Sequence, residues 1–371
     1  MTDAAANNAG PRSTNELIGH KAAERTFVEA FQGDRLHHAW LITGPKGIGK
    51  ATLAWKFAKF LLTQPEPEDV GGLFGDDISS DIDSAALNYD ADSADIKRIE
   101  AGGHGGLLPV QRTENEKTGK LRNDIVIGDI RRVNYFFSQT SAEGGWRIAI
   151  IDAADEMNRN AANALLKILE EPPEKSILFL IAHAPGKLLP TIKSRCRALK
   201  LKALPEESVQ AVLAARYPEL GTEELLALAR LSDGAPGRAI ELQEQGGIEL
   251  YRQMGGLIAA MPRLNIPEVH KLAGQLGPVK SDGRYQLFIQ IFQGWLERLI
   301  RQNATGMSAA DIMDGESAQI ASISALAGVD RWLDLWEKVG KLVTRADAVN
   351  LDRKQVIVSL FTSLAAVARG R

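Results

Sequence analysis

Two kinds of hydrophobic pattern alternate along the N-terminal part of the chain. Continuous apolar runs, typical of strands buried on both faces of a parallel sheet, occupy residues 39–42, 146–152, 176–182 and 198–201. Helical spacing covers residues 17–37, 53–61, 130–137 and 158–171. Pro172 and Pro173 stop the last of these helices. Strands that alternate with helices predict an α/β domain with a doubly wound parallel sheet.

The β pattern disappears from Pro205 onward. Three short helices are expected at 205–217, 223–231 and 235–244. Beyond them, two helical stripes are expected to lie in a core: Phe288, Phe292, Trp295, Leu296 and Leu299, then Trp332, Leu335, Trp336 and Val339. The pattern predicts four segments: a disordered lead-in at 1–16, an α/β domain at 17–202, a small helical lid at 203–247 and an all-α domain at 248–371.

An acidic stretch interrupts the α/β pattern. Residues 64–100 hold eleven acidic and two basic side chains, so the rest of the chain has a modest positive excess. That excess permits contact with nucleic acid but does not argue for it. We expect residues 64–124 to form a surface excursion with little regular structure, and order to resume near Ile125.

Composition narrows the class of protein. The 371 residues suffice for two or three domains, and 44% hydrophobic and 25% charged content is typical of a globular chain. A single cysteine, Cys196, excludes an internal disulfide and a multi-cysteine zinc site and suits a reducing cytosol. Residues 1–16 lack the apolar core of a signal peptide, and the apolar run at 177–182 is too short to span a membrane, so we expect a cytoplasmic protein without membrane contact.

The segment GPKGIGKA at residues 44–51 follows a predicted strand and precedes a predicted helix. This is the context of a phosphate-binding loop, in which glycines turn backbone N–H groups toward an anion and a lysine adds charge. The expected nucleotide-binding residues are Gly44, Pro45, Gly47, Gly49, Lys50, Ala51 and Thr52. Ala51 stands where Ser or Thr would hold Mg²⁺, and Thr52 points about 100° away along the helix. The loop is therefore expected to bind phosphates with an impaired metal site.

Asp152 ends the buried strand at 146–152, where a phosphate-loop ATPase needs a carboxylate near Mg²⁺. The next position usually holds a Glu that polarises the attacking water, but here it is Ala153. Asp155 and Glu156 follow, and we expect them to lie past the strand edge and to be turned elsewhere. Read alone, Asp152 would be interpreted as a helix-capping or loop acid, but the phosphate loop upstream favours the functional interpretation.

Three further segments resemble bacterial DNA polymerase clamp-loader subunits of the AAA+ class: LHHAWL at 36–41, NALLKILEEPP at 163–173 and LLPTIKSRC at 188–196. Within this family the spacing AHAPGKLLP at 182–190 and the ending DGAPGRA at 233–239 are closer to the delta-prime type than to the ATPase motor type. The resemblance is strong over residues 17–62 and 125–245 and only architectural beyond them.

The resemblance implies roles for individual residues. Arg195 matches an arginine finger that acts on the nucleotide of a neighbouring subunit; its alternative is a surface arginine at a strand end. Arg238 matches a second sensor that reads γ-phosphate from the lid, and Asp152 the metal-side carboxylate. His183 stands near the first sensor, where Thr or Asn is usual. Relatives often hold Zn²⁺ with four cysteines in the excursion, but residues 96–104 contain none and His104 alone is no site, so no zinc is expected.

The function implied is a delta-prime-like subunit of the replicative clamp loader, which helps load the sliding clamp onto primed DNA. Its partners would be motor and delta-like subunits in a hetero-oligomeric ring, joined through the all-α domain as a collar. Ala51 and Ala153 together favour a subunit that does not hydrolyse ATP and supplies Arg195 to a neighbour. Two alternatives stay open: an active gamma/tau-like motor subunit, and a separate AAA+ ATPase of repair or recombination.

Overall fold

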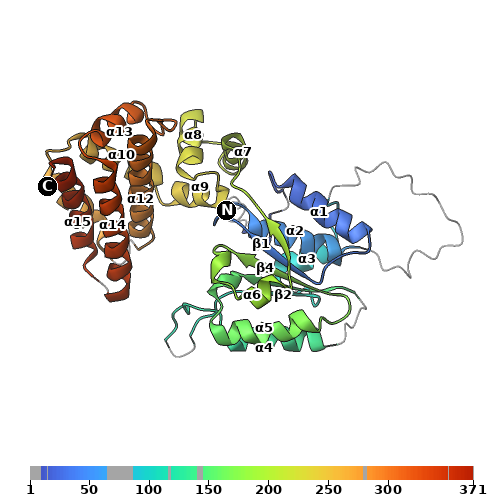
Figure 1. Ribbon diagram of the computed structural model, residues 1–371. Coiled ribbons are helices and arrows are strands. Elements are labelled where there is room, and N and C mark those ends of the chain that lie inside the picture. Colours follow the sequence, from blue (N-terminus) through green and yellow to red (C-terminus); the bar gives the residue numbers. More distant parts are fainter. Residues whose placement is uncertain are drawn as a thin grey trace, which may run out of the picture. The chain divides into compact units, whose positions relative to one another are not determined.

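The computed structural model describes residues 10–14, 16–64, 87–115, 118–139, 145–278, 282–349 and 351–370. Within these residues the chain forms two compact units, Met1–Leu204 and Pro205–Arg371, which we treat separately (Figure 1). Most of the predicted lead-in at 1–16 and residues 65–86 of the acidic stretch lie outside the described residues. The predicted boundary between a lid and an all-α domain near residue 247 falls inside the second unit and stays a prediction.

The first unit is built on a parallel sheet with the strand order β2-β3-β4-β1-β5. Its strands are β1 (Ala39–Thr43), β2 (Leu107–Val110), β3 (Arg147–Asp152), β4 (Ser176–Ala182) and β5 (Arg197–Lys200). Every residue of β1 and β4 is buried, as their continuous apolar pattern predicts. The predicted α/β fold with a parallel sheet is therefore confirmed.

Helices cover both faces of this sheet (Figure 1). They are α1 (Lys21–Gln32), α2 (Lys50–Leu62), α3 (Ala94–Ala101), α4 (Ile127–Ser138), α5 (Arg159–Glu170) and the short α6 (Pro190–Lys193), with 3₁₀ turns η1 (Ala154–Glu156) and η2 (Pro185–Lys187). On one face Phe27 of α1 stacks on Phe57 of α2 at 3.9 Å between ring centroids, and both approach Phe179 of β4. On the other face α4 and α5 pack their apolar sides on Leu41, Leu178 and Leu180. Side-chain alternation along the strands separates these two cores.

The expectation for residues 64–124 is wrong in one respect. Residues 94–101 form α3, and residues 107–110 form β2, which pairs with β3. A strand of four residues with Pro109 in it carries almost no periodic signal. Proline is tolerated because β2 lies at the edge of the sheet, where one side of the strand needs no ladder hydrogen bonds.

In the described residues of the second unit, all regular elements are helices. Its helices are α7 (Glu206–Arg216), α8 (Thr222–Leu231), α9 (Pro236–Glu244), α10 (Gly247–Ala259), α11 (Ile266–Leu276), α12 (Asp282–Thr305), α13 (Glu316–Ser324), α14 (Val329–Val349) and α15 (Arg353–Ala368). The first three match the short helices expected from the sequence. Phe288, Phe292 and Trp295 of α12 are buried, as predicted.

Trp336 departs from the prediction that both aromatic stripes lie in the core. Its neighbours Trp332, Leu335 and Val339 are buried, but Trp336 is 42% exposed and Leu333 is 44% exposed. Trp332 also donates its indole N–H to the carbonyl oxygens of Ser324 and Ala327, both at 3.1 Å. Helical spacing places Leu333 and Trp336 beside the buried face and not on it, so α14 carries a second, exposed apolar stripe.

Candidate functional site

The phosphate loop lies between the end of β1 and the start of α2. Gly44 has φ +145°, and a Cβ there would lie 2.5 Å from the carbonyl oxygen of Leu201. Gly49 takes the left-handed conformation (φ 96°) immediately before α2, and no side chain caps that helix. The first amides of α2 therefore remain available to an anion.

Lys50 is buried inside the curve of its own loop. Its Nζ donates to the carbonyl oxygens of Gly44 at 2.7 Å and Pro45 at 2.5 Å. Burial lowers the pKa of Lys50 to about 8, although the negative charges of Asp152 and Asp155 act in the opposite direction. A phosphate would have to compete with the two carbonyls for this ammonium. Ala51 offers only a methyl group beside it.

Asp152 lies at the end of β3, two strands away from β1 across β4. Burial raises the pKa of this carboxyl, and the positive charge of Lys50 and a hydrogen bond with Gln111 partly offset that increase. Each of these two charges shifts the pKa of the other group, so Lys50 and Asp152 lie near enough to interact.

Asp155 and Glu156 lie in η1, past the end of β3, and neither is available as a second metal-side acid. The carboxylate of Asp155 accepts the backbone N–H groups of His183 at 2.9 Å and Ala184 at 2.8 Å. Burial would raise the pKa of Asp155, but these hydrogen bonds outweigh it and hold the pKa below its usual range. Glu156 forms an ion pair with Arg112 at 2.8 Å. Both acids thus have structural partners.

His183 directly follows β4, at the same carboxyl end of the sheet as Asp152. Burial and the nearby Lys50 charge lower its pKa, so the neutral imidazole is favoured. Its buried Nδ1 has no hydrogen-bond partner within the described residues. A sensor role for His183 stays a prediction.

Sequence reasoning missed one wall of the site, the segment before α1. The His20 ring nitrogen Nε2 lies 2.7 Å from the carbonyl oxygen of Ile48 within the loop. Leu17 approaches Gly49 so closely that a Cβ there would meet its Cδ1 at 3.2 Å. Leu17 and Gly49 lie far apart in sequence, and no local pattern predicts such a contact.

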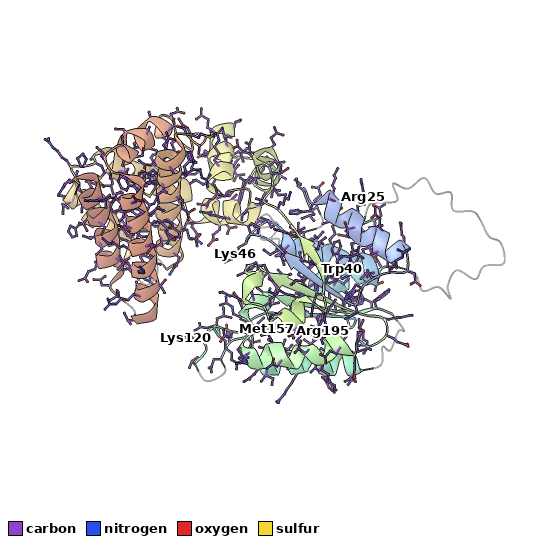
Figure 2. All side chains as sticks on the ribbon, in the orientation of Figure 1. Arg25, Trp40, Lys46, Lys120, Met157 and Arg195 are labelled. Atoms are coloured by element: carbon purple, nitrogen blue, oxygen red, sulfur yellow. The ribbon has the colours of Figure 1, made fainter. Side chains whose placement is uncertain are left out.

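Arg195 follows α6 in the first unit, and Figure 2 labels it together with Lys46 of the loop. Its guanidinium pairs with Glu170 at 2.9 Å and donates to the carbonyl oxygen of Thr191 at 3.1 Å. The side chain is 36% exposed, so this ion pair is weak and exchangeable. Arg195 is accessible to another molecule, but the finger role itself stays a prediction.

Arg238 lies in the second unit, on α9. Its Nη1 donates to Asp233 at 3.0 Å, and Asp233 is largely exposed. The role of a γ-phosphate sensor stays a prediction.

Two properties of the described residues bear on metals and membranes. Within them, no group of three or more His, Cys, Asp or Glu side chains is arranged to hold a metal ion. The described helices also include none with the length and apolarity needed to cross a bilayer.

With this geometry in place, sequence relatives are informative. The family described as "DNA polymerase III, delta subunit" matches residues 19–205, about half of the chain. The chain belongs to the DNA polymerase III delta-subunit family. The matched residues span the first unit, including the phosphate loop, Asp152 and Arg195.

The similar proteins include delta′ and gamma/tau subunits of DNA polymerase III. DNA polymerase III subunit delta′ of Pseudomonas aeruginosa is 36% identical over 58% of this chain and 59% of the relative. The delta′ subunit of Escherichia coli is 32% identical over 58% of this chain and 57% of the relative. A gamma/tau subunit of Mycobacterium bovis is 30% identical over 55% of this chain but only 31% of its own length. The aligned part of the chain thus spans somewhat more than half the length of these two delta′ proteins.

The Asp155 carboxylate should contribute to stability in a pH-dependent way. Asp155→Asn replaces one acceptor oxygen with an amide that faces a backbone donor, so we expect a loss of about 2–3 kcal/mol in the free energy of unfolding at pH 7. Because the folded-state pKa is depressed, this contribution is present above the unfolded pKa near 4 and disappears as the pH falls through the folded pKa. Urea unfolding of both proteins across pH 3–7 measures the difference.

The matched control for Asp155 is Glu156→Gln, which removes an ion pair at the protein surface and should cost less than about 1 kcal/mol. An Asp155→Asn variant as stable as Glu156→Gln at pH 7 would contradict the structural role of Asp155.

The ammonium of Lys50 should titrate near physiological pH. We expect the ¹³Cε NMR signal of Lys50 to shift with a midpoint of about 8, and Lys50→Arg to identify the signal by its loss. Bound pyrophosphate should raise that midpoint, because a neighbouring anion favours the charged form. By linkage, pyrophosphate affinity should fall as the pH rises through 8, by about fivefold between pH 8 and 9. A midpoint near the ordinary lysine value of 10.5 would refute this.

Proposed function

We propose that this chain acts as a delta′-type subunit of a bacterial clamp loader, the assembly that places a sliding clamp on primed DNA. Family membership over residues 19–205 supports the proposal most directly. The delta′ relatives from Pseudomonas and Escherichia support the delta′ type. Its partners would be motor and delta-like subunits in a hetero-oligomeric ring, the clamp, and DNA through the assembly.

The subunit itself is proposed not to hydrolyse ATP. Its donor set does not fit Mg²⁺, because Ala51 supplies no hydroxyl and Asp155 and Glu156 are engaged elsewhere. Asp152 and Asp155 are the two acids whose charges raise the pKa of Lys50, and the carboxylate of Asp155 already accepts two backbone N–H groups. The position whose side chain should polarise the attacking water holds Ala153, and its methyl group is buried. The loop could still hold the phosphates of ATP through its backbone amides and Lys50.

Arg195 is the group through which the subunit would contribute to catalysis. A guanidinium spreads positive charge over a transferring phosphoryl group and presents paired donors to its oxygens. The exposed position of Arg195 supports this role, since its Glu170 partner is itself about half exposed and is readily exchanged for a phosphate. Glu170 would then keep the finger in place until a neighbour's nucleotide arrives.

The helical unit is proposed as the ring-forming collar. Leu333 and Trp336 support this, because large apolar side chains exposed at helical spacing are typical of helix-to-helix association. The long helix α14 would bring this stripe against a neighbouring subunit.

An active motor subunit is the alternative, since a gamma/tau relative also matches the chain. Ala51 and Ala153 argue against it, because one change weakens metal binding and the other removes the residue that activates water. A separate repair or recombination ATPase is less well supported than either, given the delta-subunit family match.

Loss of the finger should lower ATP hydrolysis by the reconstituted loader without unfolding this subunit. In Arg195→Ala we expect the neighbouring site to lose on the order of 10³ in rate. The matched control is Lys193→Ala, an exposed cation on α6, which should leave turnover unchanged. The isolated native chain should show negligible turnover in a phosphate-release assay. Robust turnover by the isolated chain would support the motor alternative, and full loader activity in Arg195→Ala would remove the finger assignment.

Charging the exposed stripe of α14 should prevent assembly. In Leu333→Asp we expect at least about tenfold weaker association with motor subunits, because an aspartate would be buried at the interface. Val349→Asp, also on α14 and 58% exposed but on another side of the helix, is the matched control. Size-exclusion chromatography with light scattering gives the assembly state. Normal assembly of Leu333→Asp would show that this stripe is not the contact surface.

A further inference from the structure

The helical unit contains a cavity of about 440 Å³ whose lining residues fall between positions 206 and 312. The lining includes four arginines from three helices: Arg230, Arg238, Arg298 and Arg301. We propose that this cavity binds a small phosphorylated molecule, whose phosphate is held by these guanidinium groups. In this proposal Arg238 binds the phosphate in the cavity and not a γ-phosphate at the loop, and every lining residue belongs to the second unit.

Two of the arginines carry buried donors that lack an acceptor. The Nε atoms of Arg238 and Arg298 are buried and have no hydrogen-bond partner within the described part of the chain. A buried charged donor is destabilising unless an oxygen atom of water or of a ligand accepts a hydrogen bond from it. Phosphate oxygens suit the arginines that line the cavity, because a guanidinium can offer two parallel N–H groups to them.

The charge inside the cavity favours an anion. The acids on its wall, Glu206, Asp233 and Glu297, are partly or largely exposed, so water screens their pairing with the arginines. Arg230, Arg238 and Arg298 are less exposed, with side-chain exposures of 25%, 26% and 18%. Three of the four arginines thus lie deeper than the acids on the wall.

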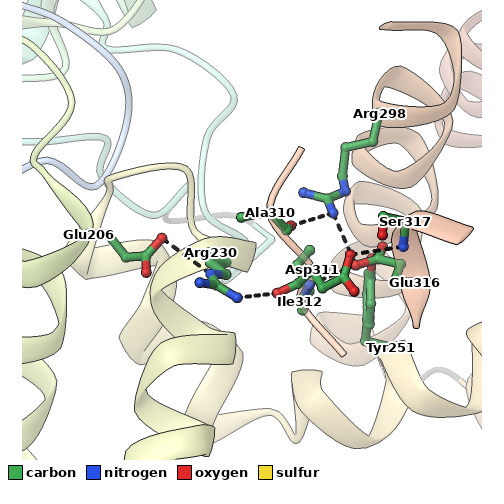
Figure 3. A network of polar contacts seen from close by, with 9 residues as sticks. All are labelled: Glu206, Arg230, Tyr251, Arg298, Ala310, Asp311, Ile312, Glu316 and Ser317. Atoms are coloured by element: carbon green, nitrogen blue, oxygen red, sulfur yellow. Dashed lines mark hydrogen bonds and ion pairs between the residues drawn. The ribbon is translucent and has the colours of Figure 1, made fainter. Parts of the chain in front are cut away.

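Neighbouring groups hold two of the guanidinium groups in place (Figure 3). Arg230 donates to Glu206 at 3.3 Å and to the carbonyl oxygen of Asp311. Arg298 donates to the carbonyl oxygen of Ala310 at 2.9 Å and to Glu316 at 3.0 Å. Side chains fixed before a ligand arrives lose little entropy on binding.

The buried carboxylate of Glu316 organises one wall. It accepts the hydroxyl of Tyr251 and the backbone N–H of Ile312 in addition to Arg298. These bonds neutralise Glu316 locally, while the buried Nε of Arg298 has no acceptor within the described residues. Glu316 therefore supports the site and does not fill it.

The cavity also has an apolar part and a size that suit more than inorganic phosphate. Ile291, Trp295 and Ile312 line it and are buried. Its volume lies in the range of small-molecule sites, about 300–1,000 Å³. A phosphate ester with a compact organic group would satisfy both parts of the lining.

Calorimetric titration of the full chain with pyrophosphate tests the proposal. The protein carries Lys50→Ala so that the phosphate loop contributes as little as possible. We expect one saturable site per chain, weakened at least about tenfold by Arg301→Gln and by Arg238→Gln, because each removes a charge-assisted contact. Arg301 is exposed, so its replacement should leave the fold intact, which thermal melting checks.

The matched control is Arg252→Gln, which removes one exposed positive charge from the same unit outside the cavity and should leave affinity unchanged. Absence of saturable binding in the Lys50→Ala protein would overturn the proposal. Equal weakening by Arg252→Gln and Arg301→Gln would also overturn it, because binding would then follow net charge alone.

Discussion

The parallel pairing of β3 with β4 and of β4 with β1 is the constraint on which the candidate nucleotide site depends. Its register places Thr43 beside Ala182 and Asp152 beside Ile181. Residues separated by more than a hundred positions therefore meet at the carboxyl ends of these strands. Asp155 secures this end of the sheet, because its carboxylate ties the segment after β3 to the first amides after β4. Removing that carboxylate would loosen the position of both Asp152 and His183.

Phosphate binding and ATP hydrolysis depend on different groups at the carboxyl ends of these strands. Phosphate binding requires backbone amides, a helix N-terminus and Lys50, all of which the loop retains. Hydrolysis also requires a bound metal and an activated water. The two positions whose side chains would hold them are occupied by Ala51 and Ala153. In the proposed clamp-loader role, a subunit with such a site would serve a neighbour through Arg195. The geometry of Arg195 suits this division, since its ion pair is weak enough to exchange.

The helical unit combines a buried polar network with an exposed apolar stripe. Glu316 is satisfied by three donors from separate segments, which fixes the relative positions of α10, α12 and the turn before α13. Trp336 and Leu333 face away from that core. The interior of this unit thus contains a polar network with its carboxylate satisfied, while its outer surface retains exposed apolar side chains.

The sequence by itself determined most of the elements of the first unit and the position of its glycine-rich loop. Long apolar runs and glycine at positions of positive φ are local signals, so β1, β4 and the phosphate loop followed from short segments. Only the tertiary structure decided the rest. Strand β2 has four residues and contains Pro109, so it cannot be recognised before its pairing with β3 is known. The contact of His20 with Ile48, the exposure of Trp336 and the gathering of four arginines around one cavity depend on contacts between distant segments, which no local pattern encodes.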